Sequence, residues 1–272
     1  MDQSWRQPGT LRVATWNVNS LRARLPRVEE WLGYARPDVL CMQETKVTDA
    51  AFPAMAFSAL GYECAFRGGD GRWNGVAVVS RVGLEDVCYG FADDTEDAEC
   101  RFLAATCAGV RVASVYVPNG RSVDSEHYQA KLNWLEQLGR HLRESCEPDR
   151  PLAVCGDFNV APDDRDVYDP ARFVGSTHTS EAERAAVREL IDWGLVDVFR
   201  QLRPEPHLYT WWDYRAGDFH SHRGMRIDLV LATQVLASKA TWTLVDRNAR
   251  KGKQPSDHAP LLVDFALGEG ER

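Results

Sequence analysis

The chain has 272 residues, of which 44% are hydrophobic and 26% are charged, and its net charge is −8. This composition is ordinary for a globular protein, and no apolar run approaches the ~18–20 residues of a membrane-spanning helix. The acidic balance argues against a general nucleic-acid coat protein, although locally basic surface would still allow a nucleic-acid enzyme.

Apolar periodicity predicts several strands and helices along the chain. Residues 11–16 predict a first strand, and Pro26 suits the first turn of a following helix. Thr48 predicts the cap of a second helix that Gly61 ends. Further strands are expected at 39–42, 75–80, 101–107, 111–117, 152–155, 227–232 and 261–267, with an acidic loop at 93–99.

Two longer helices are expected in the second half of the chain. Apolar residues at helical spacing, from Tyr128 to Leu142, predict an amphipathic helix. Ser180 and Glu183 form a capping-box pattern, which opens a helix that stops near Gly194. Because strands and helices interleave irregularly, we expect a mixed α/β layered sandwich.

The chain is expected to form one domain over residues 10–267, with loose tails at 1–9 and 268–272. Neither a linker-like stretch nor a low-complexity segment divides it. The first residues lack the apolar core of a signal peptide. Seven cysteines occur without a CxxC motif or zinc-like spacing, which predicts reduced structural thiols in a reducing compartment. A cytoplasmic location follows as the expectation.

Short polar motifs stand at the ends of six apolar strands. A strand rich in Val, Leu and Ala needs no acid at its tip in order to fold. Six such tips predict a pocket where hard oxygen and amide ligands converge, as in a metal-assisted phosphate enzyme. The motifs are TWNVNS (15–20), QETK (43–46), VYVPNGR (115–121), GDFN (156–159), RID (226–228) and SDH (256–258).

The fourth motif places Asp157 and Asn159 two residues apart at a strand end, so that both point the same way. The acid can take or orient a proton, while the amide holds water or a phosphate oxygen. Gly-Asp-x-Asn is also a good turn, which is the alternative interpretation. Glu44 can be one of the few carboxylates that Mg²⁺ needs, or a helix-start or surface glutamate beside Lys46.

His258 precedes the last strand, and Asp228 lies in the strand before it. An imidazole near a carboxylate is held in one tautomer and can stabilise phosphoryl charge. A structural histidine is the alternative, and the other six histidines are interpreted as structural. Tyr116 ends a strand and can donate its hydroxyl to a phosphate or lie in the core.

Trp211 and Trp212 are adjacent, and neighbours in a strand face opposite sides. One of them is therefore expected in a loop, where an aromatic ring can stack on a base or wall off a sugar pocket. Basic residues gather near three polar motifs, at 22–27, 215–226 and 247–253. They are either solvated surfaces or phosphate contacts.

Taken in order, the motifs resemble those of the exonuclease III family of apurinic/apyrimidinic (AP) endonucleases, part of the endonuclease/exonuclease/phosphatase superfamily. The resemblance covers residues 11 to about 265. GDFN and SDH occur across the superfamily and are weakly specific. YVPNGR, WWDYR and RGMRID within one chain point more specifically to its DNA-repair branch. The matching series is WNVNS, PDVLCMQETK, NGVAVVSR, YVPNGR, GDFNVAP, TWWDYR, RGMRID and SDHAP.

The resemblance implies a four-layer α/β sandwich of the deoxyribonuclease-I type, in which two packed mixed β-sheets are flanked by helices. The site would lie at one strand edge. Glu44 would bind Mg²⁺, or Mn²⁺, with Asn17 and Asp257 nearby as ligands or water holders.

The catalytic roles follow from the same resemblance. Asp157 would orient or deprotonate the attacking water, assisted by Asn159. His258, paired with Asp228, would contact the non-bridging phosphate oxygens, and Tyr116 would do so from the other side.

The resemblance also implies a DNA-binding surface. Asn119 and Arg121 would hold the DNA backbone, with Lys46 beside them. Trp211 and Met225 would wall the pocket for a flipped-out abasic sugar. Met225 departs from the family pattern, because some relatives carry a large aromatic residue there.

The implied function is Mg²⁺-dependent hydrolysis of DNA phosphodiesters, with incision 5′ to abasic sites, 3′→5′ trimming and removal of 3′ blocking groups. The expected partner is duplex DNA with abasic sites, nicks or blocked 3′ ends, and no membrane. We expect a monomer in the cytoplasm, near the nucleoid in a bacterium. One alternative is a superfamily hydrolase that acts on inositol phosphates, sphingomyelin or RNA tails. The other is a non-catalytic DNA-binding module, which would be expected to have lost the acidic, amide and histidine residues of the polar motifs.

Overall fold

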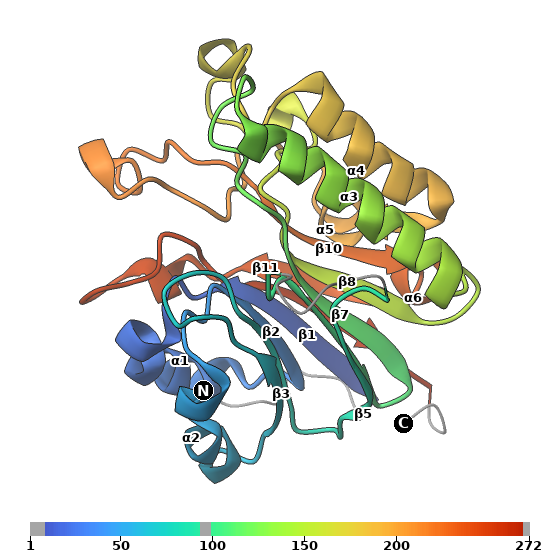
Figure 1. Ribbon diagram of the computed structural model, residues 1–272. Coiled ribbons are helices and arrows are strands. Elements are labelled where there is room, and N and C mark those ends of the chain that lie inside the picture. Colours follow the sequence, from blue (N-terminus) through green and yellow to red (C-terminus); the bar gives the residue numbers. More distant parts are fainter. Residues whose placement is uncertain (1–8, 93–98, 269–272) are drawn as a thin grey trace.

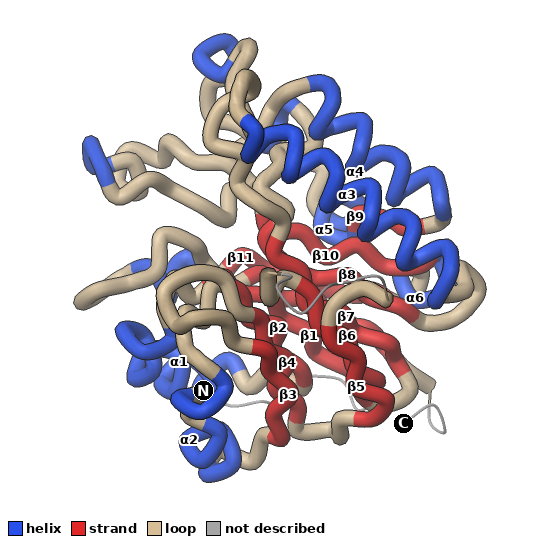
Figure 2. Tube along the Cα trace, viewed as in Figure 1, coloured by secondary structure: helices blue, strands red, loops and turns tan. Residues whose placement is uncertain are grey.

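The fold consists of two six-stranded sheets packed face to face, with helices on both outer faces (Figures 1 and 2). The computed structural model describes residues 9–92 and 99–268. The first sheet has the spatial order β11 (Ala240–Val245), β12 (Leu261–Ala266), β1 (Thr10–Asn17), β2 (Val39–Gln43), β4 (Val76–Ser80) and β3 (Glu63–Arg67). The second has the order β5 (Glu85–Tyr89), β6 (Phe102–Cys107), β7 (Val110–Tyr116), β8 (Leu152–Asp157), β10 (Asp228–Thr233) and β9 (Leu195–Asp197).

Helices cover the two outer faces in pairs. In Figure 1, α1 (Leu21–Ala35) and α2 (Ala54–Ala59) lie on the first sheet, whereas α3 (Glu126–Ser145) and α4 (Glu181–Trp193) lie together on the second. The predicted four-layer α/β sandwich is confirmed. The shorter helices are α5 (Val198–Leu202), α6 (Gln234–Ala237), η1 (Asp49–Ala51), η2 (Asp164–Asp166), η3 (Pro170–Phe173), η4 (Arg215–Gly217) and η5 (Arg247–Arg250).

Three apolar clusters fill the three interfaces between the four layers. One lies between the sheets and includes Val13, Val112 and Val263. A second joins α3 and α4 to the second sheet, and a third joins α1 and α2 to the first sheet. Since the inner strands are covered on both faces, they are apolar at nearly every position, as the continuous Val- and Leu-rich runs predicted.

Strand pairing brings the polar strand ends to one edge of the sandwich. β1 and β2 are parallel, so Asn17 lies opposite Gln43 where both strands finish. β7 and β8 are also parallel and end with Tyr116 opposite Asp157. β10 is antiparallel to β8 and begins at Asp228, opposite Asp157. The register alone therefore aligns the ends of five of the six polar motifs, two in the first sheet and three in the second.

Two helix starts differ from the prediction. The first helix begins at Leu21 after Ser20, whose hydroxyl accepts from the Ala23 N–H, so Pro26 lies inside the helix and not in its first turn. Thr48 makes no side-chain cap; only a 3₁₀ turn follows it, and α2 starts separately after Pro53. Proline restrains the residue before it to extended backbone, which splits the predicted helix in two.

The expected start and end of the helix after Ser180 are confirmed. The capping box of Ser180 and Glu183 opens α4, and Gly194 ends it. All seven cysteines are free thiols. No helix in the described ranges has the length and apolar character to cross a bilayer. The acidic loop predicted at 93–99 lies almost wholly outside the described residues.

Candidate active site

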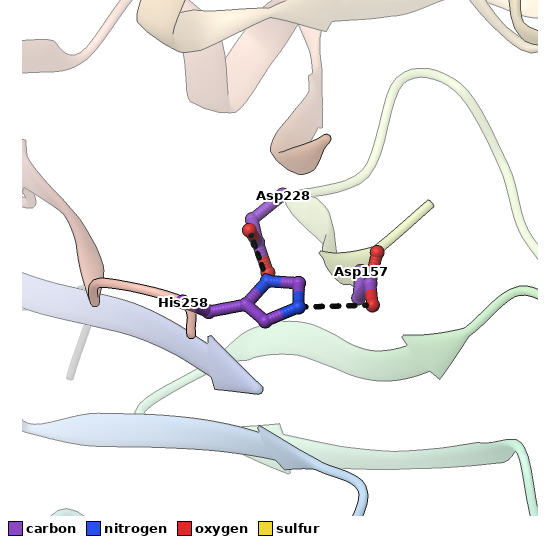
Figure 3. Close-up of side chains that lie close together, drawn as sticks. All are labelled: Asp157, Asp228 and His258. Atoms are coloured by element: carbon purple, nitrogen blue, oxygen red, sulfur yellow. Dashed lines mark hydrogen bonds and ion pairs between the residues drawn. The ribbon is translucent and has the colours of Figure 1, made fainter. Parts of the chain in front are cut away.

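Three buried side chains meet at the edge where the strand ends converge (Figure 3). Asp157 ends β8, Asp228 begins β10, and His258 stands just before β12. His258 Nδ1 donates to Asp228 Oδ2 at 2.8 Å, and its Nε2 lies 3.8 Å from Asp157 Oδ2. The Asp228 carboxylate therefore fixes the ring so that Nε2 faces Asp157, as the interpretation of a paired imidazole requires.

Burial and neighbouring charges shift the pKa values of both His258 and Asp157. Burial opposes protonation of His258, but the Asp228 and Asp157 carboxylates outweigh it and raise its pKa. Burial also raises the pKa of Asp157, and the charges of Asp228 and Glu44 act in the same direction. Asp228 Oδ1 is buried without a hydrogen-bond partner among the described residues. The cluster thus combines an imidazolium with carboxylates that are costly to keep charged.

Asn17 links this cluster to Glu44. Its Nδ2 donates to Glu44 Oε1 at 2.8 Å and to Asp157 Oδ2 at 2.9 Å. Lys46 Nζ lies 2.7 Å from the other Glu44 oxygen. Burial opposes ionisation of Glu44, but Lys46 and Asn17 lower its pKa, so the carboxylate is charged at neutral pH.

The site has the donors for a metal ion. Asp157, Asp228 and His258 offer ligand atoms within 4.8 Å of one another and could bind one. His258 Nδ1 is already committed to Asp228, and its Nε2 lies 3.8 Å from Asp157 Oδ2. The charged Glu44 carboxylate, joined to the Asp157 oxygens through the Asn17 amide, offers further oxygen donors of the kind that a hard divalent cation takes.

Asp257 takes a different position from the other predicted ligands. Its Oδ1 accepts from Asn19 Nδ2 at 2.9 Å, and its Oδ2 accepts from Trp211 Nε1 at 3.1 Å. Asn19 Oδ1 in turn accepts from Lys46 Nζ at 2.8 Å. Asn19 thus connects Asp257 to the Glu44 side of the site. The sequence interpretation gave Asn19 no role, although its spacing of two residues from Asn17 was a usable signal.

Asn159 and Asn119 extend the hydrogen-bond chain from Asp157. The Asn159 backbone N–H donates to Asp157 Oδ1 at 2.9 Å, and its Nδ2 donates to the Val117 carbonyl at 2.9 Å. Asn119 Nδ2 donates to Asn159 Oδ1 at 3.2 Å. Asn159 has a φ of 51°, so the GDFN motif does end in a turn, as the alternative interpretation expected.

Tyr116 and Glu44 line the same cavity, and the Glu44 charge acts on the Tyr116 hydroxyl. Burial raises the pKa of this hydroxyl well above its usual value, and the charges of Glu44 and Asp157 reinforce the shift. The Arg101 guanidinium stacks 4.5 Å above the ring. Tyr116 is therefore a neutral donor at the site edge.

A cavity of about 430 Å³ opens next to Tyr116. Four residues predicted to act in catalysis, metal binding or DNA binding line it together: Glu44, Lys46, Tyr116 and Asn119, with Arg121 at the exposed rim. Trp73, which the sequence interpretation left aside, is the most exposed large side chain of its wall. The cavity is polar and of the size that a sugar-phosphate fragment needs.

Trp211 and Trp212 differ as predicted. Trp211 is half-buried, forms isolated β-bridges with Met225 and His258, and so stands directly beside the Asp157–Asp228–His258 cluster. Trp212 is fully buried. Met225 is also almost fully buried and packs against Trp211, so of these two residues only Trp211 is accessible.

Parts of the basic clusters are structural. Arg226 is fully buried between Asp166 and Asp197, and Arg250 is buried against the rings of Trp212 and Phe219. Neither guanidinium is available for phosphate. His178 received a structural interpretation, yet its Nδ1 lies 2.5 Å from the Asn159 carbonyl, directly behind the site.

Comparison with known proteins places the chain in a family. A sequence profile of the endonuclease/exonuclease/phosphatase family matches residues 14–258. The exodeoxyribonuclease III of Haemophilus influenzae is 33% identical over 267 residues, which cover 94% of this chain and all of the relative.

Solved structures are similar over the same length. An AP endonuclease from Archaeoglobus fulgidus superimposes with a TM-score of 0.91 at 41% identity, over 94% of this chain and 100% of that one. The 3′ phosphatase NExo from Neisseria, bound to a product DNA hairpin, gives a TM-score of 0.90 at 39% identity, over 94% and 99%. The chain therefore belongs to the endonuclease/exonuclease/phosphatase family, as a phosphodiesterase of the exonuclease III/AP endonuclease type.

Proposed function

We propose that the protein is a Mg²⁺-dependent DNA-repair nuclease that hydrolyses a phosphodiester and leaves a 3′-hydroxyl. In a duplex with an abasic site the cut falls 5′ to the lesion. At 3′ ends the same attack removes nucleotides or blocking groups. One observation carries the proposal: the imidazolium of His258, the Asp157 carboxylate and the Glu44 carboxylate converge at one edge, beside a polar cavity.

The residues divide the chemistry between them. Asp157 accepts a proton from the attacking water or orients it, and the Asn159 N–H holds that carboxylate in place. His258 Nε2, kept protonated by Asp228, donates to a non-bridging phosphate oxygen, and the Tyr116 hydroxyl donates from the other side. Glu44 would hold Mg²⁺, or Mn²⁺, with Asn17 and Asp257 nearby as ligands or water holders, and the ion would supply positive charge against the phosphate.

The cavity and its rim bind the DNA. Lys46, Asn119 and Arg121 line one continuous wall and contact the backbone. Trp211, supported by Met225, closes the pocket that receives the extruded abasic sugar. An abasic nucleotide has no base to unpair, so its extrusion costs less than that of a normal one, which gives selectivity without reading sequence.

We further propose that residues 10–267 form one catalytic domain that works as a monomer in the cytoplasm. The pairing of β1 with β12 supports the single domain, because strands from both ends of the range lie side by side in one sheet. Light scattering of the purified protein on its own and with DNA tests the monomer.

The direct test uses three duplexes, carrying an abasic-site analogue, a nick or a 3′-phosphate, each with Mg²⁺ and with EDTA. We expect a product with a 3′-hydroxyl in Mg²⁺ and none in EDTA. A protein that binds all three duplexes but cuts none of them in Mg²⁺ would overturn the proposal. The relative rates on the three duplexes measure how the activity divides between incision and 3′-end cleaning.

A further inference from the structure

A buried ion pair lies behind the candidate active site, on the helix side of the second sheet. Lys131 comes from α3 and Glu183 from α4, and both side chains are fully shielded from solvent. Lys131 Nζ is in direct contact with Glu183 Oε1. Burying two charges costs desolvation energy, so an apolar pair of similar volume often stabilises a fold as well or better. Stability alone does not explain this pair.

The ammonium group of Lys131 is aimed at the backbone of two active-site residues. Nζ donates to the Asn159 carbonyl at 2.6 Å and approaches the Asn119 carbonyl at 3.4 Å. Asn159 and Asn119 also hydrogen-bond each other through their side chains. One buried cation thus fixes two strand-end loops, the one after β7 and the one after β8.

Glu183 holds the ammonium group in place. Its Oε1 lies 2.8 Å from the Thr177 hydroxyl and accepts from the His178 N–H at 2.9 Å. Its Oε2 accepts from the Ser180 N–H at 3.0 Å, as part of the capping box of α4. Both oxygens are saturated, so the carboxylate cannot turn without losing several bonds, and Lys131 is held with it.

The Asn159 backbone has an uncommon conformation at the edge of the site. Its φ of 51° lies in the left-handed region, which asparagine adopts more readily than most residues but which is still less populated than the right-handed one. The backbone N–H of the same residue donates to Asp157 Oδ1. A rotation of the Asn159 backbone would therefore turn the Asp157 carboxylate as well.

We propose that the Lys131–Glu183 pair is a positioning device for hydrolysis: it locks the Asn159 and Asn119 backbones and, through Asn159, the orientation of the Asp157 carboxylate. Both residues act from behind the site and touch no substrate. The inference rests on the proposed nuclease function, because its measure is the rate of phosphodiester hydrolysis.

The principal test replaces both charges at once, in the variant Lys131→Met/Glu183→Gln, which leaves no unpaired buried charge. Three quantities are measured: the single-turnover cleavage rate of an abasic duplex in saturating Mg²⁺, the Kd for that duplex in EDTA, and stability to urea. We expect the rate to fall about 10–100-fold, because a small misplacement of catalytic groups has that effect, while the Kd stays within about threefold.

A matched control is Arg12→Met/Asp264→Asn, which likewise removes both charges of a buried ion pair, Arg12 with Asp264 at 2.7 Å, between β1 and β12 and remote from Asp157. It reports what loss of a buried pair does to the rate through stability alone. All variants are assayed at a temperature where urea titration shows them folded. A rate loss in the Lys131→Met/Glu183→Gln variant no larger than in this control, or one matched by an equal loss of duplex affinity, overturns the proposal.

A milder variant decides the matter where the Lys131→Met/Glu183→Gln variant does not fold. Thr177→Val removes one hydroxyl from between Glu183 Oε1 and the Asn119 carbonyl at nearly constant volume. We expect a rate loss of about 3–10-fold at unchanged Kd. A rate within twofold of the wild type counts against the proposal. If the wild type itself cuts no duplex, the proposed function fails, which is a different result from a wild type that cuts and variants that cut equally well.

Discussion

Two buried charged clusters flank the end of β8, and they are built in opposite ways. The first, which we call the cleft cluster, consists of Asp157, Asp228 and His258 in the candidate active site. Its two carboxylates are like charges around one imidazole, and one oxygen of Asp228 has no hydrogen-bond partner among the described residues. On the helix side, Lys131 and Glu183 are opposite charges, and both oxygens of Glu183 are saturated.

The two charge patterns suit two different tasks, acid–base chemistry in the first cluster and positioning of neighbouring residues in the second. A cluster of like charges keeps proton affinities near those that acid–base catalysis needs, and it does so at a cost in stability. A saturated cluster of opposite charges has one arrangement and holds its neighbours in that arrangement. Substitutions in the first cluster should therefore affect the rate more than the stability, and those in the second should affect both.

The largest expected effect on rate is that of Asp157→Asn. Loss of the proposed acceptor for the proton of the attacking water should lower the cleavage rate about 10²–10⁴-fold. Stability should be unchanged or higher, because a buried carboxylate that repels Asp228 is removed. Single-turnover kinetics and urea unfolding measure the two quantities. A variant that cleaves within tenfold of the wild type, or one that is strongly destabilised, would show that the cleft cluster is structural.

Glu183→Gln should lower stability strongly, unlike Asp157→Asn. It leaves Lys131 buried without its counter-charge, so we expect the free energy of unfolding to fall by about 3–5 kcal/mol. Glu144→Gln is the control, because Glu144 is exposed on α3, the helix that carries Lys131. A loss of stability no greater than that of the control would mean that Lys131 is not charged, or not dependent on Glu183.

His178 predicts a pH dependence of stability. Burial, and then the charge of Lys131, lower its pKa from 6.5 to about 4. Because the unfolded chain takes up the proton first, this stabilisation is complete above about pH 6.5 and is lost as the pH falls towards 4.

The loss should amount to about 2–3 kcal/mol by pH 4. His178→Asn is the test, since asparagine tolerates the φ of 73° and can still donate to the Asn159 carbonyl. Urea unfolding from pH 7 to 4 should show a shallower decline for the variant. Parallel curves for the two proteins would assign the pH dependence to other groups.

The smallest effect is expected from Trp211→Ala. Removal of the ring that walls the proposed sugar pocket should lower cleavage of abasic duplexes about tenfold, in keeping with the worth of one aromatic contact. Cleavage at a 3′-phosphate should change less, because no sugar has to be extruded there. Trp211→Phe keeps a ring but loses the bond to Asp257, and so separates the two roles. Equal losses on both substrates would contradict the assignment of the wall.

The sequence located the inner strands and missed the outer ones. β3, β5, β9 and β11 were not predicted, and they are the four edge strands of the two sheets. Inner strands are buried on both faces and form continuous apolar runs, such as residues 76–79. Edge strands are half exposed; β5, with the sequence EDVCY, has mostly exposed positions and carries no such signal.

The residues of the candidate site likewise fall into some that the sequence indicated and some that it did not. The residue types at the strand ends were enough to select Glu44, Asp157 and His258, because acids and imidazoles have no folding role at the tip of an apolar strand. The sequence had no means of selecting Lys131, an ordinary lysine in an amphipathic helix by its pattern. Only the packing of α3 against α4 and the turn after β8 makes it the buried partner of Asn159.

By itself the sequence determined the layered α/β class, the apolar cores and the chemical character of the strand ends, since these depend on local composition and periodicity. The tertiary structure decided which of those ends touch, which arginines are buried and which helix residues support the site. Such contacts join residues far apart in the chain, as Asn17 and Asp157 do, and they depend on strand register and sheet packing.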